Sequence, residues 1–384
     1  MMEISREILT RVTILDISVI LMYIIGIVAL AQNFKKVSIR FVRFFVLIGI
    51  THLFFTFVYY FYTLNNVADS IGYYRRVLYL YDSWGETFGQ GVNFIYFLLY
   101  PLVKFIGLTY FGSFFIYSFF GLIGYYFLLK ILLEISNKKW SNWFYLLLLP
   151  NIHFWSVAIG KDSLIFFAIS FLIYTYYFNK PWYKYILPLL FIAFIRIHIL
   201  FFLLISFGMM QLLLNKRIKV VHKVLIFLLL GFTFYALFPF LMQRVGFVDT
   251  ESIISQIEDL ETRKSQGETT IDMSGENLLV KWVSYLFRPF FYDAKNFLSI
   301  VSSLENVVWV LIFIKIFKNF RRSIINSYRN IYWFSLFSIF TITVPGAYLL
   351  YNLGIAVRQK TMVVPFLFVV FFLTLYKSSI KEIN

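Results

Sequence analysis

Isolated charged side chains interrupt several apolar segments of this sequence. The segment AFIRIHILFF (193–202) places Arg196 and His198 within an apolar stretch that runs from Tyr183 to Leu214. Further isolated charges occur in IGKDS, YLFRPFF, SSLEN and AVRQK, namely Lys161, Arg288, Glu305, Arg358 and Lys360. A charge within a membrane segment costs about 3 kcal/mol or more, so such residues usually mark a functional site. Arginine suits phosphate in particular, because its planar guanidinium group donates two hydrogen bonds at once.

Each of these residues also has a purely structural interpretation. Lys161 could extend from a helix end toward the lipid headgroups, and Asp162 could cap a helix that starts at Ser163. Arg196 could form an ion pair with Glu305. The remaining structural interpretations are an interfacial hydrogen bond for His198, headgroup contacts for Arg288, and ordinary loop positions for Arg358 and Lys360.

The composition indicates a membrane protein. Of the 384 residues 60% are hydrophobic and only 14% are charged, whereas about a quarter of a typical soluble protein is charged. The chain has no cysteine, no Walker A sequence and no GxGxxG, and its histidines (His52, His153, His198, His222) lack metal-ligand spacing. We therefore expect no metal, no cofactor and, despite the net charge of +16, no nucleic acid partner. We expect His52 to pack against a polar neighbour, and His153 to join an interfacial aromatic belt.

The apolar runs predict an all-α polytopic membrane protein that forms one membrane domain over residues 1–384. As one helix, 183–214 would be about 48 Å long, whereas a bilayer core is about 30 Å thick, so we expect it to divide at Arg196–His198 and to cross twice. The run 93–108 is short and contains Pro101, which predicts an interfacial or re-entrant helix in a first outer loop, 64–111. About eleven transmembrane helices result, at 12–31, 42–63, 112–133, 143–159, 161–178, 183–195, 197–214, 220–242, 297–317, 331–350 and 361–376.

The basic residues predict the orientation of these helices. Of the 35 Lys and Arg residues, 20 lie in six segments that contain only two acidic residues; the segments are 32–43, 130–142, 179–184, 215–223, 315–330 and 377–384. The positive-inside rule assigns these segments to the cytoplasm. The N-terminus then lies outside, the C-terminus inside, and the isolated charges described above face the outer side. Lys161, Arg196, Arg288 and Arg358 would repel one another there unless an anion joins them, so we infer a lipid-linked phosphate or pyrophosphate as the ligand.

A long outer loop is predicted over residues 243–295. Its segment DTESIISQIEDLETRK places apolar residues on one helical face, and Asp249 or Thr250 can cap that helix. An amphipathic helix on the outer face would make a plausible lid, and a solvated loop without a role is the alternative.

Four segments resemble motifs of Wzy-like and EpsG-like polysaccharide polymerases of bacterial envelopes. They are PNIHFWSVAIGKDSLIFFAISFLI, IRIHILFFLL, LFRPFFYDAKNFLSIVSSLENV and YNLGIAVRQKTMVVPFLF. The matching patterns are P-x-x-x-x-W-S-x-x-x-G-K-[DE], R-P-H, F-R-P followed by S-L-E, and N-x-G-x-x-x-R, and the resemblance covers about residues 140–370. Two departures occur: Ile197 replaces the proline of R-P-H, and AVRQK lacks the expected second Arg or Tyr.

The resemblance implies a glycosyltransferase of the GT-C type in the bacterial plasma membrane. Such an enzyme transfers a glycan from undecaprenyl pyrophosphate to another lipid-linked repeat unit at the outer face, for O-antigen, capsule or exopolysaccharide, without metal or nucleotide sugar. Export and chain-length proteins of the envelope are possible partners. We assign Arg196, Arg288, Arg358 and Lys161 to the pyrophosphate. Asp69 is our first candidate for the base that accepts the acceptor's proton, with Glu305 and His198 as alternatives.

Two other classes of protein remain open. A flippase or transporter of lipid-linked oligosaccharide would need access from both faces and often shows internal repeats, which we do not find. An outer-face acyl- or phosphotransferase would use a similar arginine set but would also need a clear catalytic histidine or metal cluster.

Overall fold

The computed structural model describes residues 5–219, 221–226, 228–229, 232, 270–273, 275–320, 328–348, 350 and 352–376. The regular elements within these ranges are helices, and one isolated β-bridge joins Thr270 to Asn352. Six helices are long and apolar enough to cross a membrane, or seven if one bent pair forms a single span. The protein is therefore an all-helical, multi-pass membrane protein, as the composition predicts. Its chain divides into two compact units, Met1–Ile197 and His198–Asn384.

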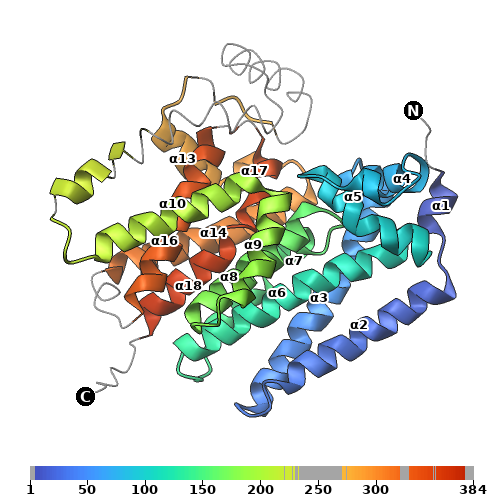
Figure 1. Cartoon of the computed structure of the whole chain (residues 1–384), viewed down its shortest axis with the longest axis horizontal. Helices are drawn as coiled ribbons and strands as arrows, with labels where there is room; N and C mark the ends of the chain where they lie inside the picture. Colours follow the sequence, from blue (N-terminus) through green and yellow to red (C-terminus); the bar gives the residue numbers. More distant parts are fainter. Residues whose placement is uncertain are drawn as a thin grey trace. The chain divides into compact units, whose positions relative to one another are not determined.

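Unit 1 contains nine α-helices with three short helical segments of other types. The α-helices are α1 (Arg6–Thr10), α2 (Ile14–Gln32), α3 (Ile39–Asn65), α4 (Asp69–Tyr79), α5 (Val92–Tyr100), α6 (Tyr110–Ile135), α7 (Pro150–Ser156), α8 (Lys161–Tyr177) and α9 (Tyr183–Ile195). The 3-10 helices η1 (Gly85–Thr87) and η3 (Asn142–Leu148) and the π-helix η2 (Pro101–Phe105) complete the unit. Helix α6 lies at its centre and packs against α2, α3 and α8 (Figure 1).

The carboxylate of Asp16 joins the starts of α2 and α6. It is fully buried and accepts hydrogen bonds from the backbone N–H and hydroxyl groups of Thr13 and Thr109, at 2.6–3.2 Å. Thr13 and Asp16 form a capping box at the start of α2, while Thr109 caps α6. A buried charge is tolerated when hydrogen bonds satisfy it, so Asp16 fixes the two helix ends against each other.

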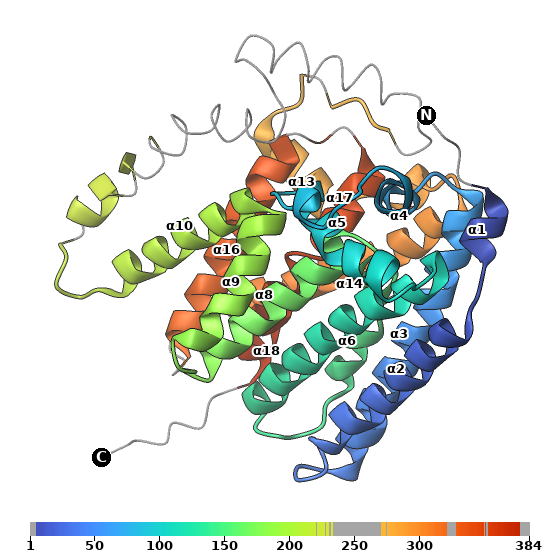
Figure 2. The same cartoon turned by 45° about the vertical axis from the view of Figure 1, so that its right-hand side comes forward.

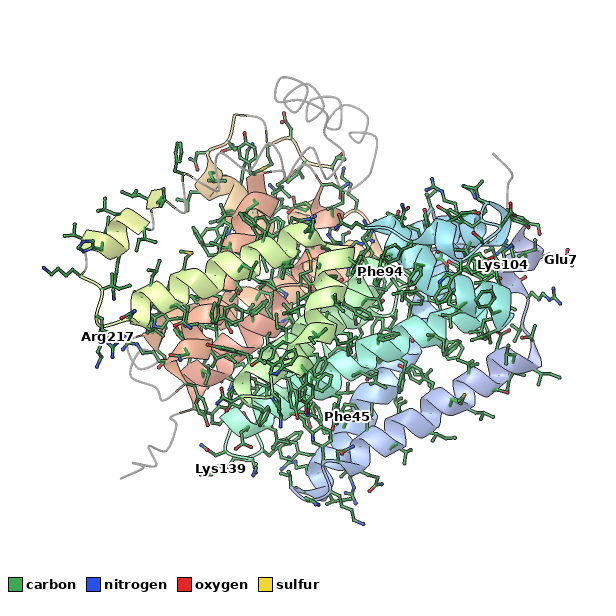
Figure 3. The ribbon with its side chains drawn as sticks, viewed as in Figure 1. Glu7, Phe45, Phe94, Lys104, Lys139 and Arg217 are labelled. Carbon is green, nitrogen blue, oxygen red and sulfur yellow. The ribbon has the colours of Figure 1, made fainter. Side chains whose placement is uncertain are left out.

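The two ends of unit 1 differ in the residues they carry. The turn from α2 to α3 and the turn after α6 lie at one end, while α4 and α5 lie at the other, in both cartoon views (Figures 1 and 2). Figure 3 shows Lys139 at the first end and Glu7 and Lys104 at the second. The basic turns predicted to share a side therefore share an end of this unit, opposite to α4 and α5.

Unit 2 contains α10 (Ile197–Leu214), α13 (Leu278–Phe287), η4 (Phe291–Asp293), α14 (Phe297–Lys318), α16 (Arg329–Tyr348), α17 (Leu353–Lys360) and α18 (Val364–Leu375). Helix α13 packs against α14, α16 and α17, and α18 packs against α14 and α16. Helix α10 reaches α16 through a hydrogen bond of 2.7 Å between the hydroxyl groups of Ser206 and Thr341. In Figure 3 Arg217 lies just beyond the end of α10.

The predicted spans agree with most of these helices but not with all of them. The predicted division of 183–214 is confirmed, because α9 ends at Ile195 and Arg196 leaves the helical conformation with φ −146° and ψ 75°. The predicted helix 143–159 is wrong as one element: η3 and α7 meet at Leu149, whose extended ψ of 126° is what a following proline requires. At the last predicted span, α17 and α18 form the bent pair, with an angle of 59° between them.

The count of about eleven passes stays a prediction. Helices α8 and α9 have 17 and 13 residues, short for a complete crossing. The run 93–108 forms α5 and η2, a short apolar helix, and its predicted interfacial or re-entrant position stays a prediction. The predicted span 220–242 and the amphipathic segment of the lid fall mainly outside the described residues.

Candidate functional site

Arg196 and Asp162 form a buried ion pair in unit 1. The Nη2 atom of Arg196 lies 3.0 Å from Oδ1 of Asp162, and their side chains are 14% and 1% exposed. Arg196 stands at the end of α9 and Asp162 in the first turn of α8, so the pair joins the ends of two packed antiparallel helices. The Nε atom of Arg196 is also buried and has no hydrogen-bond partner.

One structural alternative from the sequence is therefore wrong. Helix α8 begins at Lys161 with Gly160 as its N-cap, so Asp162 is not the capping residue and instead neutralises Arg196. Arg196 pairs with Asp162, and the alternative pairing of Arg196 with Glu305 stays a prediction.

The α7–α8 turn, which ends at Lys161, lies beside α4 and the N-cap residue of α5. Gly160 has a φ of 155°, and a Cβ atom on it would stand 3.2 Å from the ring of Tyr73 in α4. The ammonium group of Lys161 lies beside Gly91, 4.0 Å from where a Cβ would be. The backbone N–H of Gly91 in turn donates to the carbonyl of Phe194 in α9, at 2.7 Å. Lys161 and the end of α9 are thus held by the same loop.

Asp69 belongs to the same end of unit 1. It is exposed at the start of α4 and interacts electrostatically with Tyr96 of α5. The Nη1 atom of Arg76 donates to the Tyr96 hydroxyl at 2.7 Å, and the rings of Tyr73 and Tyr96 are 5.9 Å apart. Burial raises the pKa of Tyr96, while the hydrogen bond from Arg76 opposes that shift.

These contacts define a polar cluster, which we call the unit 1 site. It comprises Asp69, Tyr73, Arg76, Tyr96, Lys161, Asp162 and Arg196. Three residues selected from the sequence (Asp69, Lys161, Arg196) therefore share one neighbourhood, although up to 127 positions separate them along the chain.

Arg288 forms the corresponding ion pair in unit 2. Its Nε atom donates to Oδ2 of Asp293 at 3.0 Å, and its Nη2 atom donates to Oδ1 of the same carboxylate. The guanidinium carbon lies 5.4 Å from the centre of the Tyr292 ring. The hydrogen bonds that Arg288 donates to Asp293 raise the pKa of Arg288. The side chain of Arg288 is 21% exposed.

Lys360 ties the backbone around Arg288 to two other elements. Its ammonium group donates to the Arg288 carbonyl at 3.1 Å and to Oδ1 of Asn306 at 2.9 Å. The Nδ2 atom of Asn306 donates to the carbonyl of Pro289 at 2.8 Å, and Glu305, 4% exposed, interacts electrostatically with Lys360. Peptide Arg288–Pro289 is cis.

These contacts define the unit 2 site: Arg288, Asp293, Glu305, Asn306 and Lys360, with Arg358 one turn or less away on α17. Arg358 and Lys360 stand in the last turn of that helix, not in a loop as predicted. A second contact supports the same junction, because Tyr285 of α13 donates to Gln359 at 3.1 Å. The segments LFRPFF, SSLEN and AVRQK therefore meet in one place.

His198 begins unit 2 next to the Arg196 break. It stands in the first turn of α10, is half-buried, and its ring centre lies 6.2 Å from that of Phe202.

The structure changes the electrostatic argument for the cations. Repulsion between four unpaired cations was expected to require an external anion, but Arg196 and Arg288 each have an aspartate partner.

Sequence reasoning missed Asp293, Asn306 and Arg76 as site residues. Asp293 had a signal, because it follows Arg288 by five residues in RPFFYD. Among the described residues no group of three His, Asp or Glu side chains is arranged to hold a metal ion.

Two histidines also occupy positions that differ from expectation. His153 is fully buried, so its predicted place in an interfacial belt is wrong. It contacts His52, which confirms that His52 packs against a polar neighbour.

The chain was compared with protein-family models, characterised proteins and solved structures, and none of them matches it.

Proposed function

We propose that this protein is a membrane glycosyltransferase that polymerises lipid-linked oligosaccharide repeat units. The donor is a glycan on undecaprenyl pyrophosphate, the acceptor is a second lipid-linked repeat unit, and the reaction takes place at the outer face of the bacterial plasma membrane. The proposal includes a GT-C-like arrangement of about eleven passes. The product class can be O-antigen, capsule or exopolysaccharide.

The observation that carries the proposal is the junction in the unit 2 site. Lys360 and Asn306 donate to the carbonyls of Arg288 and Pro289, so two of the four segments that resemble polymerase motifs are hydrogen-bonded to each other. These bonds fix the backbone at Arg288 and Pro289, and the two hydrogen bonds from the guanidinium group to Asp293 fix the side chain of Arg288. Rigid placement of a cation is what stabilisation of a developing charge requires, because the cation then needs no reorganisation during the reaction.

The proposed reaction is a substitution at the anomeric carbon of the donor. The acceptor hydroxyl oxygen forms the new bond to that carbon while the bond to the pyrophosphate oxygen breaks. The electron pair leaves with the pyrophosphate, whose growing negative charge Arg288 and Arg358 stabilise. The hydroxyl proton passes to a carboxylate, for which Asp69 is our first candidate because it is exposed to solvent.

The unit 1 site fits a role in binding a phosphate. Lys161 and Arg196 supply positive charge beside the buried rings of Tyr73 and Tyr96. Asp162 compensates Arg196 in the resting protein. The pair has one unsatisfied donor, the Nε atom of Arg196, which remains for an oxygen ligand.

Two variants test whether the proposed reaction needs the positive charge of Arg288 or only its ion pair with Asp293. Arg288→Ala removes the cation, whereas Asp293→Asn keeps it and only weakens the pair. With purified protein in lipid nanodiscs and a lipid-linked repeat unit as substrate, we expect Arg288→Ala to lower kcat at least a hundredfold and Asp293→Asn less than tenfold.

The two variants distinguish catalysis from folding. Both remove one partner of the same ion pair, so a merely structural arginine would give similar losses of activity and of thermal stability in both. Glycan translocation without lengthening by the unmodified protein would favour the flippase instead.

A further inference from the structure

His52 and His153 form a buried, hydrogen-bonded pair that has no role in the proposed reaction. His52 stands at the midpoint of α3, a candidate membrane span, and His153 belongs to α7. Both side chains are 0% exposed. Their Nδ1 atoms face each other at 2.9 Å.

The other nitrogen of each ring contacts a backbone carbonyl. Nε2 of His52 lies 3.0 Å from the carbonyl oxygen of Ser118 in α6. Nε2 of His153 lies 2.9 Å from the carbonyl oxygen of Leu147 in η3. All four ring nitrogens of the pair are thus at hydrogen-bond distance from a partner.

The number of protons in this arrangement follows from the partners. A carbonyl oxygen only accepts, so each Nε2 must carry a proton. The contact between the two Nδ1 atoms needs one more proton, on either atom. Three protons on two imidazole rings are one more than two neutral rings hold, so full use of these hydrogen bonds requires one positive charge on the pair.

A neutral pair would leave two lone pairs in contact. If both Nε2 atoms kept their protons, the unprotonated Nδ1 atoms would face each other at 2.9 Å; if one ring changed tautomer, its Nε2 lone pair would face a carbonyl. Burial disfavours a charge. Here the charge is shared by two rings, and three charge-assisted hydrogen bonds offset the cost.

Aromatic rings stabilise the same charge. Tyr125 stacks on His153 with ring centres 4.4 Å apart and an angle of 12°, and Phe55 stacks on it at 5.8 Å and 13°. The faces of aromatic rings attract cations. Gly121 permits the close approach of α6, because a Cβ there would stand 2.8 Å from Nε2 of His52.

We propose that His52 and His153 form a binding site for one proton, shared between their Nδ1 atoms within unit 1, and that this proton fastens α7 to α3. Four residues separate α7 from Lys161, so the site also steadies the turn that carries Lys161 and Asp162.

Few other titratable groups face the pair. From α6 the group is Tyr125, and α2 brings Tyr23, whose hydroxyl lies 3.1 Å from that of Ser118. η3 contributes only the Leu147 carbonyl, and neither histidine forms an ion pair with a carboxylate in the part of the chain that the structure describes. The proton is therefore held by the two rings themselves.

Nitrogen NMR of the full-length protein in lipid nanodiscs tests the proposal. With ¹⁵N-labelled histidine at pH 7, we expect three protonated nitrogens and one bare nitrogen in the pair, with a coupling between the two Nδ1 atoms across the hydrogen bond. The exposed His222 supplies a matched control: His222→Gln should leave this pattern intact, whereas His153→Gln should abolish it. Two protonated nitrogens in the unmodified protein would overturn the proposal, and that measurement needs no variant to fold.

Hydrogen exchange tests the fastening of α7 separately. We expect amides of residues 150–160 to exchange at least tenfold faster in His153→Gln than in the unmodified protein or in His222→Gln. Equal exchange in all three proteins would refute the fastening role. Neither measurement depends on glycan transfer, so failure here would not bear on the proposed enzyme.

Discussion

The Asp162–Arg196 ion pair is predicted to be a strongly coupled contact of unit 1. The two atoms are 3.0 Å apart, and the aspartate is almost completely buried while the arginine is 14% exposed. Removing one partner of a buried pair costs about 3–5 kcal/mol, because the other charge is left unpaired. Arg196→Gln should be near the upper end, since it strands the more deeply buried Asp162. Asp162→Asn should be near the lower end, because water can reach part of Arg196.

A double-mutant cycle measures this coupling. The four proteins are the unmodified chain, Arg196→Gln, Asp162→Asn and the double variant, and the free energy of unfolding is followed in detergent micelles by titration with denaturant. The double variant strands no charge, so its destabilisation should be smaller than the sum of the single effects by about 2–3 kcal/mol. Additivity of the single effects to within about 0.5 kcal/mol would refute the pairing.

Two further contacts give predictions of the same kind. Lys360→Met leaves the Arg288 carbonyl and the Asn306 side chain without their donor, so we expect about 2–4 kcal/mol of destabilisation with a lower kcat for glycan transfer; unchanged values of both would contradict the role of this lysine. Asp16→Ala leaves four donors of Thr13 and Thr109 unsatisfied and should cost about 3 kcal/mol in unfolding free energy, with Asp16→Asn less harmful because one oxygen is retained.

The overall class and several helix ends could be predicted from the sequence. Long apolar runs predict membrane helices because the bilayer core stabilises an apolar helix whose backbone hydrogen bonds are all internal. This depends on the segment itself and not on the tertiary structure. The break at Arg196 was predictable for the same reason, since 183–214 is too long for one crossing. It forms without the proline of the R-P-H pattern, with Ile197 in its place.

The partners of the charged residues could not be predicted in the same way. Asp162 looks like a helix cap in sequence, because caps are local, and only the packing of α8 against α9 brings it to Arg196. Asn306 donates to the Pro289 carbonyl from 17 positions away in the sequence, and Lys360 donates to the Arg288 carbonyl from 72 positions away. Such contacts depend on how helices pack, which periodicity does not specify.

The histidine pair is a third case. His52 and His153 are 101 positions apart and carry no motif spacing. The sequence prediction placed His153 in an interfacial aromatic belt, whereas the structure turns the imidazole inward toward α3 and α6. A single histidine in an apolar run thus says little about its side chain until the facing helix is known.

The most direct test of the proposed function is the stoichiometry of glycan lengthening. Purified protein in nanodiscs is incubated with one defined undecaprenyl-pyrophosphate-linked repeat unit, and both the glycan length and the free undecaprenyl pyrophosphate are measured. Polymerisation predicts glycans of several repeat units, with one undecaprenyl pyrophosphate released for every new linkage. Unlengthened glycans with no lipid pyrophosphate released would contradict the proposal.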